Sequence, residues 1–237
     1  MDVTLDSIRD VRLYQSKTGY RFSVDSLLLY DFVNLKEVTA IADLGAGSGI
    51  VGILLAKKYL HARIALFEIQ DSLISLAEKN VVTNNLKNRV KVIKCDLRTL
   101  PAFPSPRPYD LVVSNPPFRR LQSGLINIEE ERAVARHEIK LRLQELVDAA
   151  SSLLRAKGRL NMIYHPCRLS ELVDILRRRN IEPKRFRFVH STTSTESKMV
   201  LIEAVKGART GLKVDRPFYI YREDGGYTDE METIYNP

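Results

Sequence analysis

The segment "DLGAGSG", residues 43 to 49, indicates the fold of this chain. An apolar run at 39–45 leads into it and a stretch with helical spacing follows at 48–60, so the glycines fall where a strand passes into a helix. Glycines at 45, 47 and 49 let the backbone turn tightly and let a ligand approach without a Cβ in the way. Ligands of open α/β sheets bind beyond the carboxyl ends of the strands. The segment therefore predicts a nucleoside-binding loop.

Strand-like and helix-like segments alternate along the rest of the chain. Further strands are expected at 62–69, 89–96, 109–115, 159–165, 185–190 and 198–205, and further helices at 71–85, 142–158 and 168–180. The last two strands have no helix between them. This order predicts an α/β protein with a doubly wound, mostly parallel sheet, helices on both faces and a closing antiparallel pair. Ser48 is the expected N-cap of the first helix, and Gly158 the expected C-cap of helix 142–158.

The length of 237 residues, 44% of them hydrophobic, predicts one large domain. Its expected core is 39–206. A segment at 1–38, with a turn at Gly19 and then a helix-like apolar run, is expected to lie over the cofactor and substrate site. An extension at 207–237, with a Tyr-rich strand and a polar tail, is expected to belong to the same domain.

The net charge is +8, with 37 Lys and Arg against 29 Asp and Glu. This favours an anionic partner such as nucleic acid, although a solvated basic surface explains it equally well. The only two cysteines, Cys95 and Cys167, do not suit a disulfide framework or a zinc cluster, and the four histidines lack the spacing of a metal site. The sequence shows no signal-peptide core and no membrane-spanning run. We therefore expect a soluble, cytoplasmic protein without a metal.

Two acidic residues follow the strands after the glycine segment. Glu68 lies 19 residues after Gly49, where a carboxylate can accept hydrogen bonds from both hydroxyls of a ribose. Asp96 ends the next strand-like segment, where it can bind an adenine amine while Leu97 packs on the base. The glycine spacing is GxGxG and not the dinucleotide GxGxxG, so a pyrophosphate cradle is not expected.

In this order of elements the chain resembles the class I S-adenosylmethionine-dependent methyltransferases over nearly its whole length. The resemblance implies a seven-stranded sheet whose last strand is antiparallel, and S-adenosylmethionine as the cofactor. It places the methionine part of the cofactor on Asp43, Gly45, Ala46, Gly47 and Gly49. It places the ribose on Glu68 with the adjacent Ile69, and the adenine on Asp96 and Leu97.

A second segment, "SNPPFRR" (114–120), follows a strand-like run. Pro116 and Pro117 cannot donate to a strand ladder, so they end the strand sharply. An amine on an aromatic ring or an amide is a poor nucleophile because its lone pair is delocalised, and it must be oriented toward the methyl donor. The Asn115 side-chain oxygen and the Pro116 carbonyl can each accept one N–H, and Phe118 offers a face for a flat base. Methyl transfer depends on this alignment more than on acid–base help.

The segment resembles the (N/D/S)PP(F/Y) motif of methyltransferases that modify exocyclic or amide nitrogens. Asn115, Pro116, Pro117 and Phe118 are therefore the candidate catalytic residues, and Asn115 is also expected to contact the cofactor. Three classes share the motif: adenine or guanine methylases of RNA, adenine methylases of DNA, and glutamine methylases of release factors.

Three further segments favour RNA. The runs "GYRFSVDSLLLYDF" (19–32), "ARHE" (135–138) and "RPFYIYREDGGYTDEMETIY" (216–235) resemble the bacterial tRNA adenine-N6 methyltransferases that act beside the anticodon of a valine tRNA. A glutamine methylase would need a separate helical module before the glycine segment, and only about forty residues precede it. A non-catalytic nucleic-acid-binding protein would be expected to lack Asn115 or the glycines.

This resemblance implies tRNA as the partner, with the target adenine flipped out or already unstacked. Tyr20 and Phe22 are expected in the pocket, although a core role suits them equally. Arg119, Arg120 and Arg136 could hold phosphates or could pair with Glu129 to Glu131. His137 and Glu138 are expected to anchor a loop or to cap a helix, and not to act in the chemistry. A further basic cluster, 177–179 and 183–188, is expected to form a solvated face.

Overall fold

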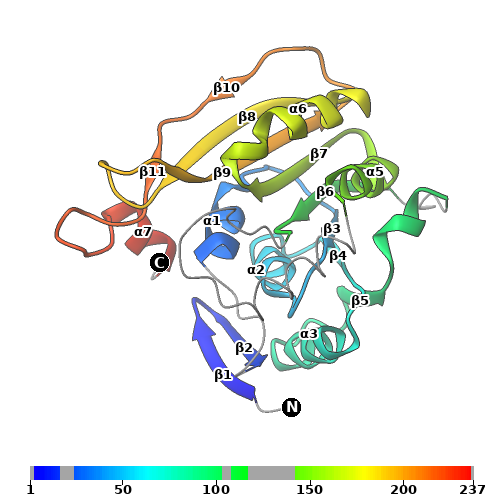
Figure 1. The fold of residues 1–237 in the computed structure, drawn as a ribbon. Helices are drawn as coiled ribbons and strands as arrows, with labels where there is room; N and C mark the ends of the chain where they lie inside the picture. Colours follow the sequence, from blue (N-terminus) through cyan, green and yellow to red (C-terminus); the bar gives the residue numbers. More distant parts are fainter. Residues whose placement is uncertain (1–2, 17–23, 103–107, 117–141, 236–237) are drawn as a thin grey trace, which may run out of the picture.

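A mixed sheet of nine strands forms the centre of the fold (Figure 1). The computed structural model describes residues 3–16, 24–102, 108–116 and 142–235. Seven core strands are β3 (Ala40–Leu44), β4 (Arg63–Glu68), β5 (Val90–Lys94), β6 (Tyr109–Ser114), β7 (Leu154–Tyr164), β8 (Ile181–His190) and β9 (Ser197–Lys206). They lie in the order β8-β9-β7-β6-β3-β4-β5. β9 alone runs opposite to the other six strands, which confirms the predicted mostly parallel sheet and its antiparallel closing strand.

Two short strands extend the predicted seven to nine. They are β10 (Lys213–Val214) and β11 (Phe218–Tyr219), and both pair with β8 in parallel. β11 lies within the predicted Tyr-rich strand of the extension, whereas β10 is not predicted, because its two residues are too few to show an alternating pattern.

Helices cover both faces of the sheet, as the alternation predicts (Figure 1). α1 (Val24–Phe32), α2 (Ile50–Lys58) and α3 (Asp71–Thr83) pack on one face, and α5 (Leu143–Leu153) and α6 (Leu169–Arg178) on the other. Short 3-10 helices, η1 (Leu97–Ala102) and η2 (Pro166–Arg168), follow β5 and β7. The strand period of two separates the faces, since Ile41 joins the cluster under α1 and α2 while Ala42 joins the cluster under α5.

The prediction that Gly158 caps a helix is wrong. α5 ends at Leu153, and β7 begins at the next residue, so Gly158 lies inside a strand. A Cβ on Gly158 would lie 2.9 Å from the carbonyl oxygen of Arg155 and 3.0 Å from that of Tyr109. Glycine is needed here because the β6–β7 register shifts between Tyr109 and Leu111 and brings the two backbones close together.

Two elements lie outside the predicted pattern. The first is a hairpin of β1 (Val3–Ile8) and β2 (Val11–Ser16), which forms its own two-stranded sheet beside α3 (Figure 1). The second is α7 (Asp229–Tyr235), which lies within the expected polar tail and buries Met231 and Ile234. The Arg9 guanidinium at the hairpin turn donates to the Ile234 carbonyl at 2.6 Å, so the two elements are joined.

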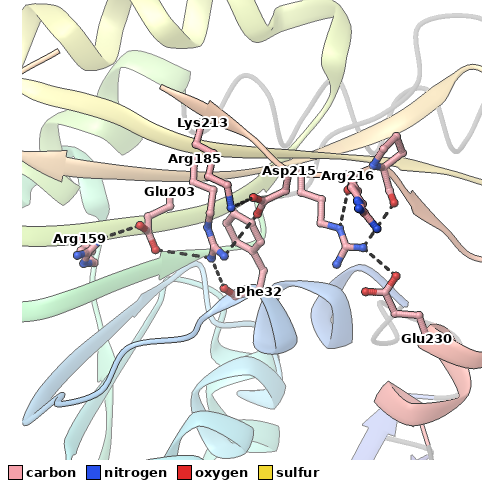
Figure 2. Close-up of polar contacts among 10 residues, drawn as sticks. Phe32, Arg159, Arg185, Glu203, Lys213, Asp215, Arg216 and Glu230 are labelled. Carbon is pink, nitrogen blue, oxygen red and sulfur yellow. Dashed lines mark hydrogen bonds and ion pairs between the residues drawn. The ribbon is translucent and has the colours of Figure 1, made fainter. Parts of the chain in front are cut away.

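Arginines of β8 hold the C-terminal extension and α1 against the sheet (Figure 2). Arg185 donates to the Phe32 carbonyl at 2.6 Å and lies over the Phe32 ring, 3.9 Å from its centroid. Its guanidinium is also 3.7 Å from Glu203 and 3.6 Å from Asp215. This single side chain therefore contacts a helix, the neighbouring strand and the extension.

Arg187, two residues further along β8, makes a similar set of contacts. It donates to the Arg216 carbonyl at 3.1 Å and pairs with Glu230 at 2.8 Å. The prediction of a solvated basic face at 183–188 is therefore wrong for Arg185 and Arg187, which are half-buried and paired. Residues 177–179 are exposed, as expected, and their partners are Glu182, Asp174 and Asp148.

Candidate active site

The glycine loop and Asn115 begin side by side at the carboxyl ends of two neighbouring parallel strands. Asp43 of β3 is in register with Val113 of β6. One residue further along, Ser114 Oγ donates to the Leu44 carbonyl at 2.8 Å. The two motifs that the sequence singled out are thus brought to one edge of the sheet.

Three residues of the glycine loop have backbone conformations in the left-handed region, which favours glycine. The φ angles of Gly45, Gly47 and Gly49 are 71°, 58° and 87°. The backbone nitrogens of Gly45 and Ala46 both donate to the Phe67 carbonyl, at 2.9 and 3.0 Å. A Cβ on Gly45 would meet no atom within 4 Å, whereas one on Gly49 would lie 3.0 Å from Leu66 Cδ1. Gly45 therefore leaves room for a ligand, and Gly49 leaves room for β4.

The helix after the loop begins differently from the prediction. Its N-cap is Gly49 in the left-handed region, without a side-chain capping bond, so the assignment of Ser48 as N-cap is wrong. Ser48 Oγ is buried and has no hydrogen-bond partner in the part of the chain that the structure describes. A buried hydroxyl without a partner, in the same loop as the open position at Gly45, suits a loop that receives a polar ligand.

Asp43 lies buried beneath this loop, and its Oδ2 accepts a hydrogen bond from the Gly52 nitrogen at 2.9 Å. Burial raises the pKa of Asp43 to about 7; the hydrogen bond from Gly52 opposes the rise and the charge of Glu68 adds to it. A carboxylate with so raised a pKa at a ligand-binding edge marks a candidate functional residue.

Sequence reasoning missed Gly52. A Cβ there would lie 2.2 Å from Leu66 Cδ2, so only glycine lets α2 approach β4 closely enough to donate to Asp43. Gly47, Gly49 and Gly52 together have the GxGxxG spacing, in which the third glycine serves helix–strand packing. The GxGxxG spacing is therefore present in the sequence and is the signal that could have found Gly52. The expectation that the loop is no pyrophosphate cradle is not contradicted by this packing role.

Glu68 lies at the end of β4, next to the glycine loop, and is buried. Its Oε2 accepts from the Gly47 nitrogen at 2.9 Å, and its Oε1 accepts from the nitrogens of Ile69 and Gln70 at 2.8 and 2.9 Å. A carboxylate has about four acceptor positions, and backbone donors occupy three of them. Binding of both ribose hydroxyls, as predicted, would therefore require one of these backbone bonds to give way.

Asp96 is placed where the adenine site is expected, at the end of β5, but its carboxylate already has a partner. Arg98 donates to it through the backbone nitrogen at 3.0 Å and through Nε at 2.9 Å. The side-chain bond from Arg98 holds the pKa of Asp96 below its usual value. Leu97 is buried in the apolar cluster that includes α5 residues, so little of its surface faces a base. Both assignments stay predictions.

Asn115 is half-buried at the end of β6, and the structure supplies a neighbour that the sequence analysis did not single out. Its Nδ2 donates to Ser26 Oγ, a buried hydroxyl on α1, at 3.2 Å. An amide whose nitrogen is held in this way directs its Oδ1 elsewhere, where it can accept a substrate N–H. Pro116 is half-buried beside it.

Several residues of the predicted site lie outside the described ranges. They are Tyr20, Phe22, Pro117, Phe118, Arg119, Arg120, Arg136, His137 and Glu138. Within the ranges that are described, no cluster of three or more His, Cys, Asp or Glu side chains could hold a metal ion. No helix of those ranges combines the length and apolar character needed to cross a membrane.

Residues 21–171 match the methyltransferase small domain family. The chain belongs to this family. Three bacterial relatives of this methyltransferase are each named tRNA1(Val) (adenine(37)-N6)-methyltransferase. The Porphyromonas gingivalis relative is 28% identical over 86% of this chain and 81% of its own length, and that of Pedobacter heparinus is 26% identical over 93% and 91%. The match to the Bacteroides thetaiotaomicron relative, at 28% identity, covers 64% of this chain and 62% of that protein.

Solved structures share the fold of this methyltransferase. A predicted O-methyltransferase from Agrobacterium tumefaciens superposes with a TM-score of 0.71 at 20% identity, covering 89% of this chain and 94% of that one. A 16S rRNA N2 G1207 methyltransferase from Thermus thermophilus, solved with AdoMet and guanosine, has a TM-score of 0.60 at 17% identity and covers 86% and 50%. Both likenesses establish the class I methyltransferase architecture.

S-adenosylmethionine, the methyl donor of this methyltransferase, fits the described residues. The open space at Gly45 admits a ligand against the loop, and the acid of Asp43 lies beneath it to balance a cationic amine. Glu68 and Asp96 follow in order at the ends of the next two strands, on the path that a bound nucleoside would take. The individual assignments to methionine, ribose and adenine are proposals.

Proposed function

We propose that this methyltransferase transfers the methyl group of S-adenosylmethionine to the N6 amine of an adenine in tRNA, beside the anticodon. The observation that carries the proposal is the Asn115 amide, held by Ser26 next to the glycine loop with its oxygen directed away from that contact. The names of the relatives support tRNA as the substrate, and so does the net charge of +8.

In this proposal the protein acts by orienting the amine. Asn115 Oδ1 and the Pro116 carbonyl each accept one N–H of the adenine N6 group, which turns its lone pair toward the methyl donor. When bound, S-adenosylmethionine supplies the electrophilic methyl group. Ser26 keeps the Asn115 amide from rotating, so the acceptors are in place before the substrate arrives.

The base must leave its stack to reach these acceptors, and the proposal assigns this step to residues beyond the described ranges. Phe118 provides a stacking face, which is worth about 1–3 kcal/mol for a nucleobase. Arg119, Arg120 and Arg136 hold phosphates on either side of the flipped adenine. Tyr20 and Phe22 line the pocket.

The first test measures methyl transfer from labelled S-adenosylmethionine to total bacterial RNA, DNA and protein in parallel. We expect the wild type to label the tRNA fraction and nucleoside digestion to give N6-methyladenosine. Asn115→Ala removes the acceptor, and we expect a rate loss of about 100-fold or more. Asn115→Asp keeps an acceptor and should retain more activity than the alanine variant.

Ser26→Ala tests the orientation of the Asn115 amide separately from its role as a hydrogen-bond acceptor, because the Asn115 side chain itself is kept. Loss of one hydrogen bond predicts a fall in kcat of about fivefold, equivalent to about 1 kcal/mol, without a matching change in the KM for tRNA. Label in protein as methylglutamine would overturn the tRNA assignment while the fold stands. Cofactor binding without label in any fraction would overturn the catalytic proposal.

A further inference from the structure

Two asparagines four residues apart, Asn80 on α3 and Asn84 at its C-cap, attach the N-terminal hairpin to the core. Asn80 Oδ1 accepts from the Tyr14 nitrogen at 2.6 Å, and its Nδ2 donates to the Tyr14 carbonyl at 3.1 Å. Asn84 makes the same pair of contacts with Arg12, at 3.1 and 2.7 Å. Each side-chain amide thus pairs with the backbone of β2 as a neighbouring strand would. Both asparagines are buried.

The third hydrogen bond distinguishes the two asparagines. Asn80 Nδ2 also donates to the Ser48 carbonyl in the glycine loop, at 2.9 Å. Asn84 instead donates to the Asn80 carbonyl within α3, at 2.8 Å. Asn80 therefore bridges the hairpin and the glycine loop, whereas Asn84 contacts the hairpin and its own helix.

The Ser48 carbonyl lies between two constrained residues of the glycine loop. On one side the nitrogen of Gly47 is held by Glu68, and on the other Gly49 begins α2 in the left-handed region. A small rotation of the loop on ligand binding would move the Ser48 carbonyl and with it the acceptor for Asn80. Beyond Tyr14 the chain leads through β2 to α1, the helix that carries Ser26.

We infer that Asn80 is a positioning residue that couples the glycine loop to the N-terminal hairpin, so that cofactor binding and hairpin docking stabilise each other. The inference rests on the proposed function for the identity of the ligand. Such coupling is reciprocal: the cofactor strengthens docking of the hairpin by the same factor by which the docked hairpin strengthens cofactor binding. Binding of the methyl donor would thus favour the docked hairpin before the substrate binds.

The test compares Asn80→Ala with Asn84→Ala, because each variant removes one pair of bonds to β2. Both should lower Tm by similar amounts. Only Asn80→Ala should weaken S-adenosylmethionine binding, by about tenfold in calorimetric titration of the full chain. Addition of S-adenosylmethionine should slow hydrogen exchange of residues 3–16 in the wild type and in Asn84→Ala, but not in Asn80→Ala.

A second matched pair, Asn80→Asp and Asn84→Asp, keeps the acceptor oxygen and removes the donors, and it serves if an alanine variant fails to fold. Equal affinities in the two members of a pair, or hydrogen exchange that responds alike, would overturn the coupling. A wild type that binds no S-adenosylmethionine would instead overturn the proposed function, so the two failures are distinguishable.

Discussion

Asp110 and Asp43 lie on neighbouring strands, one near the amino ends of the strands and the other at the carboxyl ends. They differ in how many hydrogen bonds their carboxylates accept. Asp110, near the amino end of β6, accepts from the nitrogen and hydroxyl of Thr39 at 2.8 and 2.7 Å and from the nitrogen of Ala40 at 3.0 Å. Arg155 pairs with its other oxygen. Asp43, at the carboxyl end of β3, receives the Gly52 nitrogen.

The pKa values express this difference. Burial acts to raise the pKa of Asp110, but the hydrogen bonds from Arg155, Thr39 and Ala40 outweigh it and hold the pKa at about 2, whereas the pKa of Asp43 is raised to about 7. Polar groups with hydrogen-bond partners thus close the amino edge of the sheet, whereas the carboxyl edge keeps an acid whose hydrogen bond from Gly52 does not offset its burial. An under-satisfied group is costly to folding, and this methyltransferase places it where a ligand can compensate it.

The largest expected effect comes from Asp43→Asn, measured by chemical denaturation without cofactor at pH 5.0 and pH 7.5. The folded pKa of about 7 lies above the ordinary value of 3.8, so the unfolded chain releases this proton first and wild-type stability falls as pH rises between these values. The slope is about 1.4 kcal/mol per pH unit at most. The variant lacks this slope, so its stability relative to the wild type should increase at pH 7.5.

If the wild type and Asp43→Asn differ in unfolding free energy by the same amount at both pH values, the proposed difference between Asp43 and Asp110 is contradicted. Asp43 would then be ionised throughout, like Asp110. Other titrating groups are common to both proteins and cancel in the comparison.

Asp110→Asn should have a smaller effect with the opposite pH dependence. Its pKa is depressed below 3.8, so its stabilisation is fully present above that pH and is lost as pH falls through about 2. We expect the variant to lose about 1–3 kcal/mol at pH 7 by urea denaturation, and the deficit to shrink below pH 4. Affinity for S-adenosylmethionine should not change, and a change of several-fold would show that the two edges are not independent.

The smallest expected effect comes from replacing glycines in the left-handed region, and it separates the cost of backbone strain from the loss of ligand contact. Gly45 and Gly225 have φ angles of 71° and 88°, and a Cβ on either would meet nothing within 4 Å. Gly45→Ala and Gly225→Ala should therefore each lose about 1 kcal/mol of stability for the left-handed backbone alone. Only Gly45→Ala should also weaken S-adenosylmethionine binding, by about tenfold in calorimetric titration; equal affinities would remove Gly45 from the site.

Sequence patterns predicted the sheet, its closing antiparallel strand and the location of Asp43, Glu68 and Asn115, because these follow from local periodicity and from motifs at strand ends. They missed Ser26 and Asn80 for a physical reason. Ser26 lies 89 residues from Asn115, and Asn80 lies 66 residues from Tyr14, so both contacts depend on the completed fold. The sequence positions of short polar side chains such as these follow no periodic pattern from which a distant hydrogen-bond partner could be predicted.

Two of the errors concern element ends, where backbone geometry outweighs residue preference. Gly158 resembles a helix cap in sequence but serves a close strand contact, and Ser48 resembles an N-cap although Gly49 takes that position. α7 lies within the expected polar tail, and only two of its residues, Met231 and Ile234, are buried, so its sequence shows little apolar periodicity.

The bond between Arg9 and Ile234 has a consequence for synthesis of the chain on the ribosome. Its two partners are 225 residues apart, so the hairpin emerges first and its contact with Ile234 becomes available only after every strand of the central sheet has been made. The Arg9 guanidinium also lies over the Tyr30 ring of α1, 5.2 Å from its centroid. A nascent chain therefore cannot form this link beside α1, the helix that carries Ser26, until α7 has been made.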